Sequence, residues 1–328
     1  MTHNQHPLGS GFTSASTADD VLTGIDLTGV NVIVTGGHAG LGLETTRALS
    51  KAGASVTVGA RNPQRATQTV EGIERVEVGR LDLADPASIE AFTARRADSG
   101  RPLHILINNA GVPLHEKREV DARGYEMQFA TNHLGHFQLT LGLLPALRAA
   151  GGARVVNLSS GGHRLSDIRW HDLHFTEGYQ SFLAYGQSKT AAVLFAVELD
   201  RRWADDGIRG YAVHPGIVAG TSLNSSVGEE QLKATGLMDE HGQPVVDLER
   251  GIKTVQQGAA TTVFASTSPL LEGIGGVYLK DNDISELDRD PQPLTGAEKA
   301  PPADVVQYAI DPQSARRLWE LSEELIKG

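Results

Sequence analysis

Apolar residues along the chain fall into short β-branched runs, which alternate with longer segments of helical periodicity. The β-branched runs predict about seven strands, at residues 30–35, 54–60, 75–82, 103–108, 154–158, 208–214 and 277–279. Helical segments run from the glycine-rich sequence after residue 35 to about residue 51, then over 86–96, 125–150, 184–204 and 312–326. This alternation predicts a single-domain, doubly wound (Rossmann) α/β fold, with a parallel sheet covered on both faces.

The expected core domain spans residues 26–280, with extensions at both ends. The amino-terminal extension, 1–25, is expected to be partly disordered, and the carboxyl-terminal extension, 281–328, is expected to end in a helix. An insertion at 161–182 and a polar segment at 221–249 interrupt the alternation, and long loops of this kind are usually functional. We interpret 221–249 as a lid. The apolar side of the insertion either packs on the domain or roofs a substrate pocket.

Charge and composition narrow the class of function. The net charge of −11 disfavours nucleic acid as a partner, because it repels phosphate backbones. The absence of cysteine excludes disulfides and thiolate chemistry. No stretch approaches the roughly 18–20 apolar residues of a membrane span, and the amino terminus lacks the apolar core of a signal peptide. These features predict a cytoplasmic protein with no membrane partner.

The turn after the first predicted strand contains Gly36, Gly40 and Gly42. Glycines let the chain turn tightly and let backbone N–H groups approach a pyrophosphate, which the positive end of the following helix also attracts. A turn that binds nothing is the alternative for an isolated glycine cluster. The position of this turn, after the first strand of an alternating chain, favours a dinucleotide site.

Tyr185 and Lys189 lie four residues apart on a predicted helix, and this spacing places both on one face. A phenol with a pKa near 10 exchanges protons poorly at neutral pH, and a nearby ammonium lowers that pKa. The pair therefore predicts acid/base chemistry, with a surface pair as the alternative.

The insertion carries His163, His171 and His174, with Asp167 and Asp172 nearby. Their spacing matches no zinc pattern. We interpret the histidines as surface residues and expect no metal.

Three motifs occur in order: Thr35-Gly-x-x-x-Gly-x-Gly42, Asn108-Asn-Ala-Gly111 and Tyr185-x-x-x-Lys189. Together they resemble the short-chain dehydrogenase/reductase family, over about residues 27–279. The long segment between Ser160 and Tyr185 is more similar to its retinol-dehydrogenase-like and protochlorophyllide-reductase-like branches. The resemblance implies an NAD(P)-dependent dehydrogenase or reductase that acts on CH–OH or C=O groups.

The resemblance also implies catalytic roles for four residues. Tyr185 is the acid/base, and Lys189 lowers the pKa of the phenol and binds the nicotinamide ribose. Ser160 hydrogen-bonds the reacting oxygen, with its neighbour Ser159 as the rival for this role. Asn132 holds a water molecule against the lysine.

The cofactor-binding positions follow from the same motifs. Asp82 and Leu83 match the position that contacts adenine, and Thr221 stands one residue after the family's threonine, whose place holds Gly220. The full set comprises Gly36, His38, Gly40, Leu41, Gly42, Arg61, Asn62, Asp82, Leu83, Asn109, Ala110, Gly111, Tyr185, Lys189, Pro215, Gly216, Val218 and Thr221.

Charge after the second predicted strand predicts which cofactor is preferred. NAD-binding sites carry an acidic residue there for the ribose 2′-hydroxyl, whereas this chain reads Ala60-Arg61-Asn62. A guanidinium at this position pairs with a 2′-phosphate. We therefore expect Arg61, helped by His38, to favour NADP (NADPH), with NAD as the second possibility. A solvated surface arginine is the alternative.

The leading hypothesis is an NADP-dependent oxidoreductase that transfers a hydride between nicotinamide and a carbonyl or alcohol carbon of a small, apolar molecule. Two alternatives stay open: a non-catalytic dinucleotide sensor or scaffold, and an enone (C=C) reductase. The oligomeric state stays open as well, with a homo-oligomer through the two long helices as one possibility.

Overall fold

The computed structural model describes residues 5–218, 228–292 and 301–327. Within these residues, one eight-stranded sheet has the order β3-β2-β1-β4-β5-β6-β7-β8. The strands are β1 (Asn31–Thr35), β2 (Ser55–Ala60), β3 (Val76–Arg80), β4 (Ile105–Asn108), β5 (Ala153–Leu158), β6 (Ile208–His214), β7 (Val277–Lys280) and β8 (Asp283–Ile284). The first seven pair in parallel and β8 pairs antiparallel to β7. The predicted doubly wound fold is confirmed, and β8 is a short addition to the seven expected strands.

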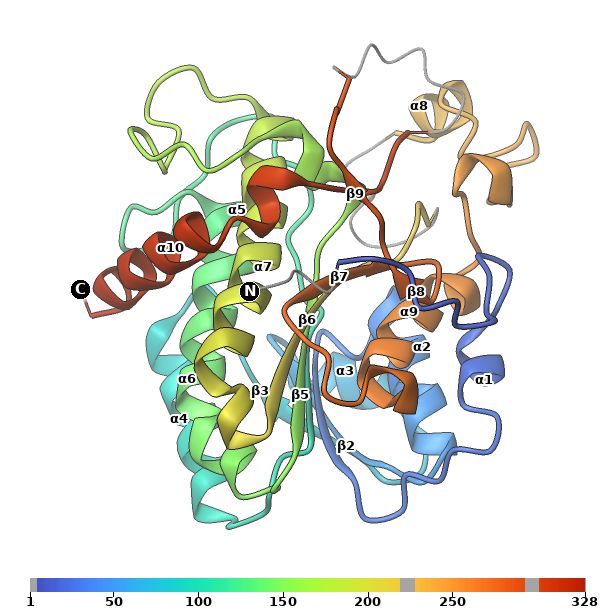
Figure 1. The fold of residues 1–328 in the computed structure, drawn as a ribbon, viewed down its shortest axis with the longest axis vertical. Helices are drawn as coiled ribbons and strands as arrows, with labels where there is room; N and C mark the ends of the chain where they lie inside the picture. Colours follow the sequence, from blue (N-terminus) through green and yellow to red (C-terminus); the bar gives the residue numbers. More distant parts are fainter. Residues whose placement is uncertain (1–4, 219–227, 293–300, 328) are drawn as a thin grey trace.

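Helices cover both faces of the sheet (Figure 1). One face carries α4 (Pro86–Asp98), α6 (His136–Arg148) and α7 (Ser181–Trp203), and the other carries α1 (Ala18–Val21), α2 (Gly40–Lys51), α3 (Pro63–Thr69) and α9 (Val255–Thr267). Successive strand residues point to opposite faces, so Ile33 belongs to the core cluster that contains Phe137 on one side, and Val34 belongs to the cluster that contains Phe264 on the other.

Helix α9 is not among the predicted helices, because it has no polar face to give a helical periodicity. Most of its residues are buried, and small side chains make up much of it. Its start carries a capping box, in which the Thr254 side chain accepts from the Gln257 backbone N–H while the Gln257 side chain bonds the Thr254 backbone. This local signal was present in the sequence, although the helical periodicity was not.

The long helix predicted at 125–150 is not uniform. It consists of α5 (Met127–Phe129), a π-helical turn η1 (Ala130–Gly135) and α6. A side chain at Gly135 would collide with the backbone carbonyl of Leu83, so this turn packs directly on the loop after β3. The widened turn contains Asn132, and turns of this type often occur at functional sites.

Both extensions pack against the domain. The carboxylate of Asp283 accepts hydrogen bonds from the backbone N–H groups of Leu8, Gly9 and Ser10, which holds the described part of the amino-terminal extension beside β8. In the carboxyl-terminal extension, β9 (Leu287–Asp288) pairs in parallel with β10 (Val305–Val306), and α10 (Pro312–Leu325) packs on α7.

The insertion at 161–182 starts with a 3₁₀ helix, η2 (Gly161–Leu165), and packs partly on the domain, since Ile168 and Phe175 are buried. The prediction that its histidines lie on the surface is wrong for His163, which is fully buried, and right for His171. His174 is half-buried and stacks on Tyr125. Among the described residues, no cluster of metal-ligating side chains is present.

In the described part of the chain, no helix combines the length and the apolar character that a membrane span requires.

Candidate active site

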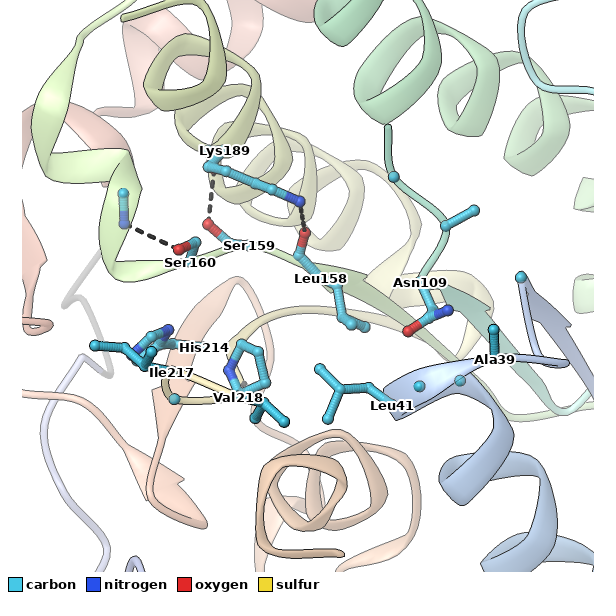
Figure 2. Close-up of a pocket in the computed structure, with 18 of the residues that line it drawn as sticks. Ala39, Leu41, Asn109, Leu158, Ser159, Ser160, Lys189, His214, Ile217 and Val218 are labelled. Carbon is cyan, nitrogen blue, oxygen red and sulfur yellow. Dashed lines mark hydrogen bonds between the residues drawn. The ribbon is translucent and has the colours of Figure 1, made fainter. Parts of the chain in front are cut away.

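A cavity of about 1450 Å³ opens at the carboxyl ends of the strands, between the glycine turn and α7. Figure 2 shows the two sides, with Ala39 and Leu41 facing Ser160 and Lys189 across the hollow. The predicted residues that line it are Gly36, His38, Gly40, Leu41, Gly42, Arg61, Asn62, Asp82, Leu83, Asn109, Ala110, Gly111, Ser160, Tyr185, Lys189, Pro215, Gly216 and Val218. Asn132 is not among the lining residues, and Thr221 lies outside the described residues.

The glycine turn forms a cradle that only glycine permits. Gly36 has a positive φ of 65°, and a Cβ built on Gly42 would lie 2.5 Å from both the Gly36 carbonyl oxygen and the Asn109 Nδ2. The Thr35 hydroxyl accepts hydrogen bonds from the backbone N–H groups of Asn109 and Ala110, each at 2.9 Å. The Asn-Asn-Ala-Gly segment is therefore fastened to the turn, and the cradle fits the backbone of a dinucleotide.

Beside the turn lies a basic edge at the start of α3. The Asn62 side chain accepts a hydrogen bond from the Arg65 backbone N–H, so it caps α3. Arg61 and Arg65 are exposed and both line the cavity. Burial, and then the charge of Arg65, lowers the pKa of His38, whose Nδ1 has no hydrogen-bond partner among the described residues.

Arg65 is not among the predicted cofactor-binding residues, although it is a second arginine close to Arg61 in the sequence. Arg61 directly precedes the cap residue Asn62, Arg65 lies in the first turn of α3, and both line the cavity. The two guanidinium groups and His38 together fit an anionic group.

Lys189 is almost fully buried on α7, above the end of β5. Its Nζ donates a hydrogen bond to the Leu158 carbonyl oxygen at 3.0 Å (Figure 2). The same Nζ lies 5.5 Å from the centre of the Tyr185 ring. Burial lowers the pKa of the Lys189 ammonium to about 8. The ammonium is thus positioned beside the phenol, as the four-residue spacing predicted.

Tyr185 and Ser160 face each other in the cavity. Burial raises the pKa of the Tyr185 phenol, and a hydrogen bond with the Ser160 side chain acts in the opposite direction. The Ser160 Oγ also accepts from the Gly162 backbone N–H at 3.0 Å. The Ser159 hydroxyl instead donates to the Lys189 carbonyl oxygen at 2.8 Å and is buried. Of the two serines, Ser160 lies beside the phenol.

Asn132 does not line the cavity, but its side chain bonds two segments that do, the segment after β4 and α7. Its Oδ1 accepts from the Val112 backbone N–H and its Nδ2 donates to the Ser188 Oγ, both at 3.1 Å. The Ser188 hydroxyl in turn donates to the Tyr185 carbonyl oxygen at 2.8 Å. Asn132 therefore links the segment after β4 to the helix that carries Tyr185.

A parallel sheet whose first strand ends in a glycine cradle, with polar groups on a facing helix, defines a dinucleotide-binding protein of the Rossmann type. A family model for short chain dehydrogenases matches residues 30–232. The chain is 45% identical to a "Probable oxidoreductase" of Streptomyces antibioticus, over 93% of this chain and 100% of the relative. It is 35% identical to retinol dehydrogenase 12 of Mus musculus, over 93% of this chain and 88% of the relative.

Among solved structures, an uncharacterized protein from Mycobacterium Paratuberculosis is 31% identical, with a TM-score of 0.70 over 95% of this chain and 98% of that chain. The chain belongs to the short-chain dehydrogenase/reductase family and is an NAD(P)-dependent oxidoreductase.

Proposed function

We propose that this chain is an NADP-dependent oxidoreductase that interconverts a carbonyl group and an alcohol, with Tyr185 as the acid/base. The observation that carries the proposal is that Tyr185, Ser160 and Lys189 line the same cavity as the glycine cradle. Tyr185 is close enough to Ser160 for their side chains to hydrogen-bond, and Lys189 lies against the ring. A phenol, a hydroxyl and an ammonium together can bind and protonate one oxygen atom.

The nicotinamide, when bound, supplies or accepts the hydride. In reduction, the Ser160 hydroxyl donates a hydrogen bond to the substrate oxygen, and the Tyr185 Oη transfers its proton to that oxygen as negative charge develops there. The ammonium of Lys189 stabilises the phenolate that remains. In oxidation, the Tyr185 phenolate removes the proton from the alcohol oxygen. Asn132 holds the segment after β4 and α7 at a constant separation through its two side-chain bonds.

The preference for NADP rests on the charges beside the glycine turn. Arg61 and Arg65 line the cavity there, and the residues directly after β2 include no acid. Guanidinium groups pair with a 2′-phosphate by charge-assisted hydrogen bonds, whereas an acidic residue there would repel it. His38 offers an additional polar group at the same edge.

The proposed substrate is a small molecule with an apolar body. Leu165, Ile217, Pro301 and Pro302 line the part of the cavity walls outside the glycine turn. The relative named retinol dehydrogenase 12 supports an apolar alcohol or aldehyde by analogy alone. A cytoplasmic location stays a prediction.

A substrate panel tests the proposal against its two alternatives. The panel contains apolar aldehydes, ketones and matched enones, and the measurements are the oxidation of NADPH and the structure of each product. Alcohol products from the carbonyl compounds, lost in Tyr185→Phe, support the proposal. Saturated carbonyl products from the enones would support the C=C reductase instead. Tight binding of NADPH without turnover of any compound would support the non-catalytic sensor.

A further inference from the structure

The loop that carries Ser160 is held on several sides. Ser160 is the last residue before η2, and the Gly161 backbone N–H donates to the Nδ1 of His214 at 3.0 Å. A Cβ built on Gly162 would lie 2.7 Å from Cε1 of Tyr185, so the loop packs directly on the phenol ring. Any displacement of this loop therefore moves the Ser160 hydroxyl relative to Tyr185.

His163 belongs to the same segment, in η2, three residues after Ser160, and is fully buried. Its Nδ1 is 2.7 Å from the carbonyl oxygen of Ser160, and its Nε2 is 3.4 Å from the backbone nitrogen of Val306 in β10. A carbonyl oxygen can only accept and a backbone N–H can only donate, so Nδ1 carries the proton and Nε2 does not. Burial lowers the pKa of His163 to about 4, which favours this neutral form. One tautomer thus satisfies both bonds.

The carboxyl-terminal extension encloses His163 from the other side. The Tyr308 hydroxyl donates to the His163 carbonyl oxygen at 2.8 Å, and the neighbouring Arg164 bonds the Asp304 carbonyl oxygen at 2.8 Å and the Asp288 carboxylate at 2.7 Å. The His163 ring also packs on Tyr278, with 4.9 Å between ring centres. Polar contacts of His163 and Arg164, most of them partly buried, therefore join the extension to the serine loop.

We propose that His163 is a positioning residue: by bridging the Ser160 carbonyl oxygen and β10, it lets the carboxyl-terminal extension set the place of the Ser160 hydroxyl beside Tyr185. This inference rests on the proposed function, in which Ser160 binds the reacting oxygen. Displacements of about 1 Å at a reacting centre can reduce rates by up to 100-fold, so a loosened loop lowers turnover without changing the residues that bind the cofactor.

Two substitutions of similar size separate the two bonds of the imidazole. The amide nitrogen of His163→Asn can take the place of Nδ1 and keep the bond to Ser160, whereas the amide oxygen of His163→Gln can take the place of Nε2 and keep the bond to Val306. We expect His163→Gln to lower kcat about tenfold. His163→Asn should keep kcat within about threefold of that of the original protein. The dissociation constant for NADPH, measured by fluorescence, stays the same in both.

A double-mutant cycle with Ser160→Ala distinguishes positioning from general stability. If His163 acts through Ser160, His163→Gln lowers kcat by less than about twofold once the Ser160 hydroxyl is gone. An equal loss in both backgrounds, or full activity of His163→Gln, would overturn the inference. Unchanged turnover in Ser160→Ala alone would instead contradict the proposed function, so the two failures are distinguishable.

A variant on the extension covers the case in which His163→Gln does not fold. Tyr308→Phe removes only the hydroxyl that bonds the His163 carbonyl oxygen. We expect it to lower kcat about two- to fivefold in the original protein and not at all in Ser160→Ala. The same loss in both backgrounds, or no loss in either, would show that the extension does not act through Ser160.

Discussion

Lys189 and Leu158 join the catalytic helix to the sheet: the Lys189 ammonium donates to the Leu158 carbonyl oxygen at 3.0 Å. A second bond runs the other way, from the Ser159 hydroxyl to the Lys189 carbonyl oxygen. Because both bonds are buried, α7 cannot slide along the end of β5 without leaving polar groups unpaired. The same arrangement buries the Lys189 ammonium, and burying a charged group lowers the free energy of unfolding.

We expect Lys189→Met to raise the free energy of unfolding at pH 7 by roughly 1–3 kcal/mol while it abolishes activity. The folded-state pKa of Lys189, about 8, lies below its ordinary value of 10.5. The penalty for charging it in the folded state is fully present below pH 8 and disappears as the pH rises above 10.5. Denaturant unfolding of both proteins from pH 7 to 10 measures the difference, which should shrink with rising pH.

The control for this prediction is Lys117→Met, because Lys117 is exposed. Its effect on the free energy of unfolding should be small and nearly constant with pH. A pH-independent difference for Lys189→Met would contradict the lowered pKa.

Tyr185→Phe removes the phenol hydroxyl and keeps the ring that packs on Gly162. We expect kcat to fall about 10²–10⁴-fold, because general acid/base groups contribute effects of this size. The dissociation constant for NADPH should change little. Tyr179→Phe, on the insertion, is the matched control and should keep its turnover, since Tyr179 bonds the His115 carbonyl oxygen outside the cavity. Turnover of Tyr185→Phe close to that of the original protein would refute the assignment.

Arg61→Ala and Arg65→Ala should each lower the ratio of kcat/KM for NADPH to that for NADH by about tenfold, equivalent to about 1.4 kcal/mol. The reason is the loss of a guanidinium that faces the 2′-phosphate and has no counterpart in NADH. Steady-state kinetics with both cofactors give the ratio. Arg148→Ala, at an exposed ion pair with Asp206, should leave it unchanged. If the ratio stays constant in both test variants, the proposed NADP preference has another origin.

Gly42→Ala should destabilise the protein by about 1–3 kcal/mol, because the added methyl would overlap the Gly36 carbonyl and the Asn109 amide. Binding of NADPH should weaken about tenfold or more, since the cradle must widen. Calorimetric unfolding and titration with NADPH measure the two effects. Gly152→Ala is the control, because no atom lies within 4 Å of a Cβ at that position. Equal affinities in the two variants would show that the cradle does not bind the cofactor.

Much of the fold followed from local patterns. The β-branched runs at β1, β2 and β6 predicted strands to within a residue or two, because β-branched residues favour strands and strands covered on both faces form short apolar runs. The spacing of Tyr185 and Lys189 placed both on one helix face by the helical period alone. These features were predictable because they depend on interactions between residues three or four positions apart, which the local sequence alone specifies.

Other features depended on residues far apart in the sequence. The sequence left Ser159 and Ser160 as rivals, and only the packing of α7 on β5 places the Ser159 hydroxyl against a backbone carbonyl. His163 was expected on the surface, yet it is buried because β10, more than a hundred residues later, covers it. The π-helical turn η1 likewise packs against a distant segment, since its Gly135 lies directly on the backbone of Leu83.

The sequence by itself determined the alternation of strands and helices through most of the sheet, the glycine turn and the residues available for acid/base chemistry, since these depend on short-range geometry. Tertiary structure decided which polar side chains face the cavity and which hydrogen-bond the backbone instead. It also decided which residues the carboxyl-terminal extension covers. The physical reason is that burial and hydrogen-bond pairing are properties of the packed chain, and side chains of the same type have different roles once their surroundings differ.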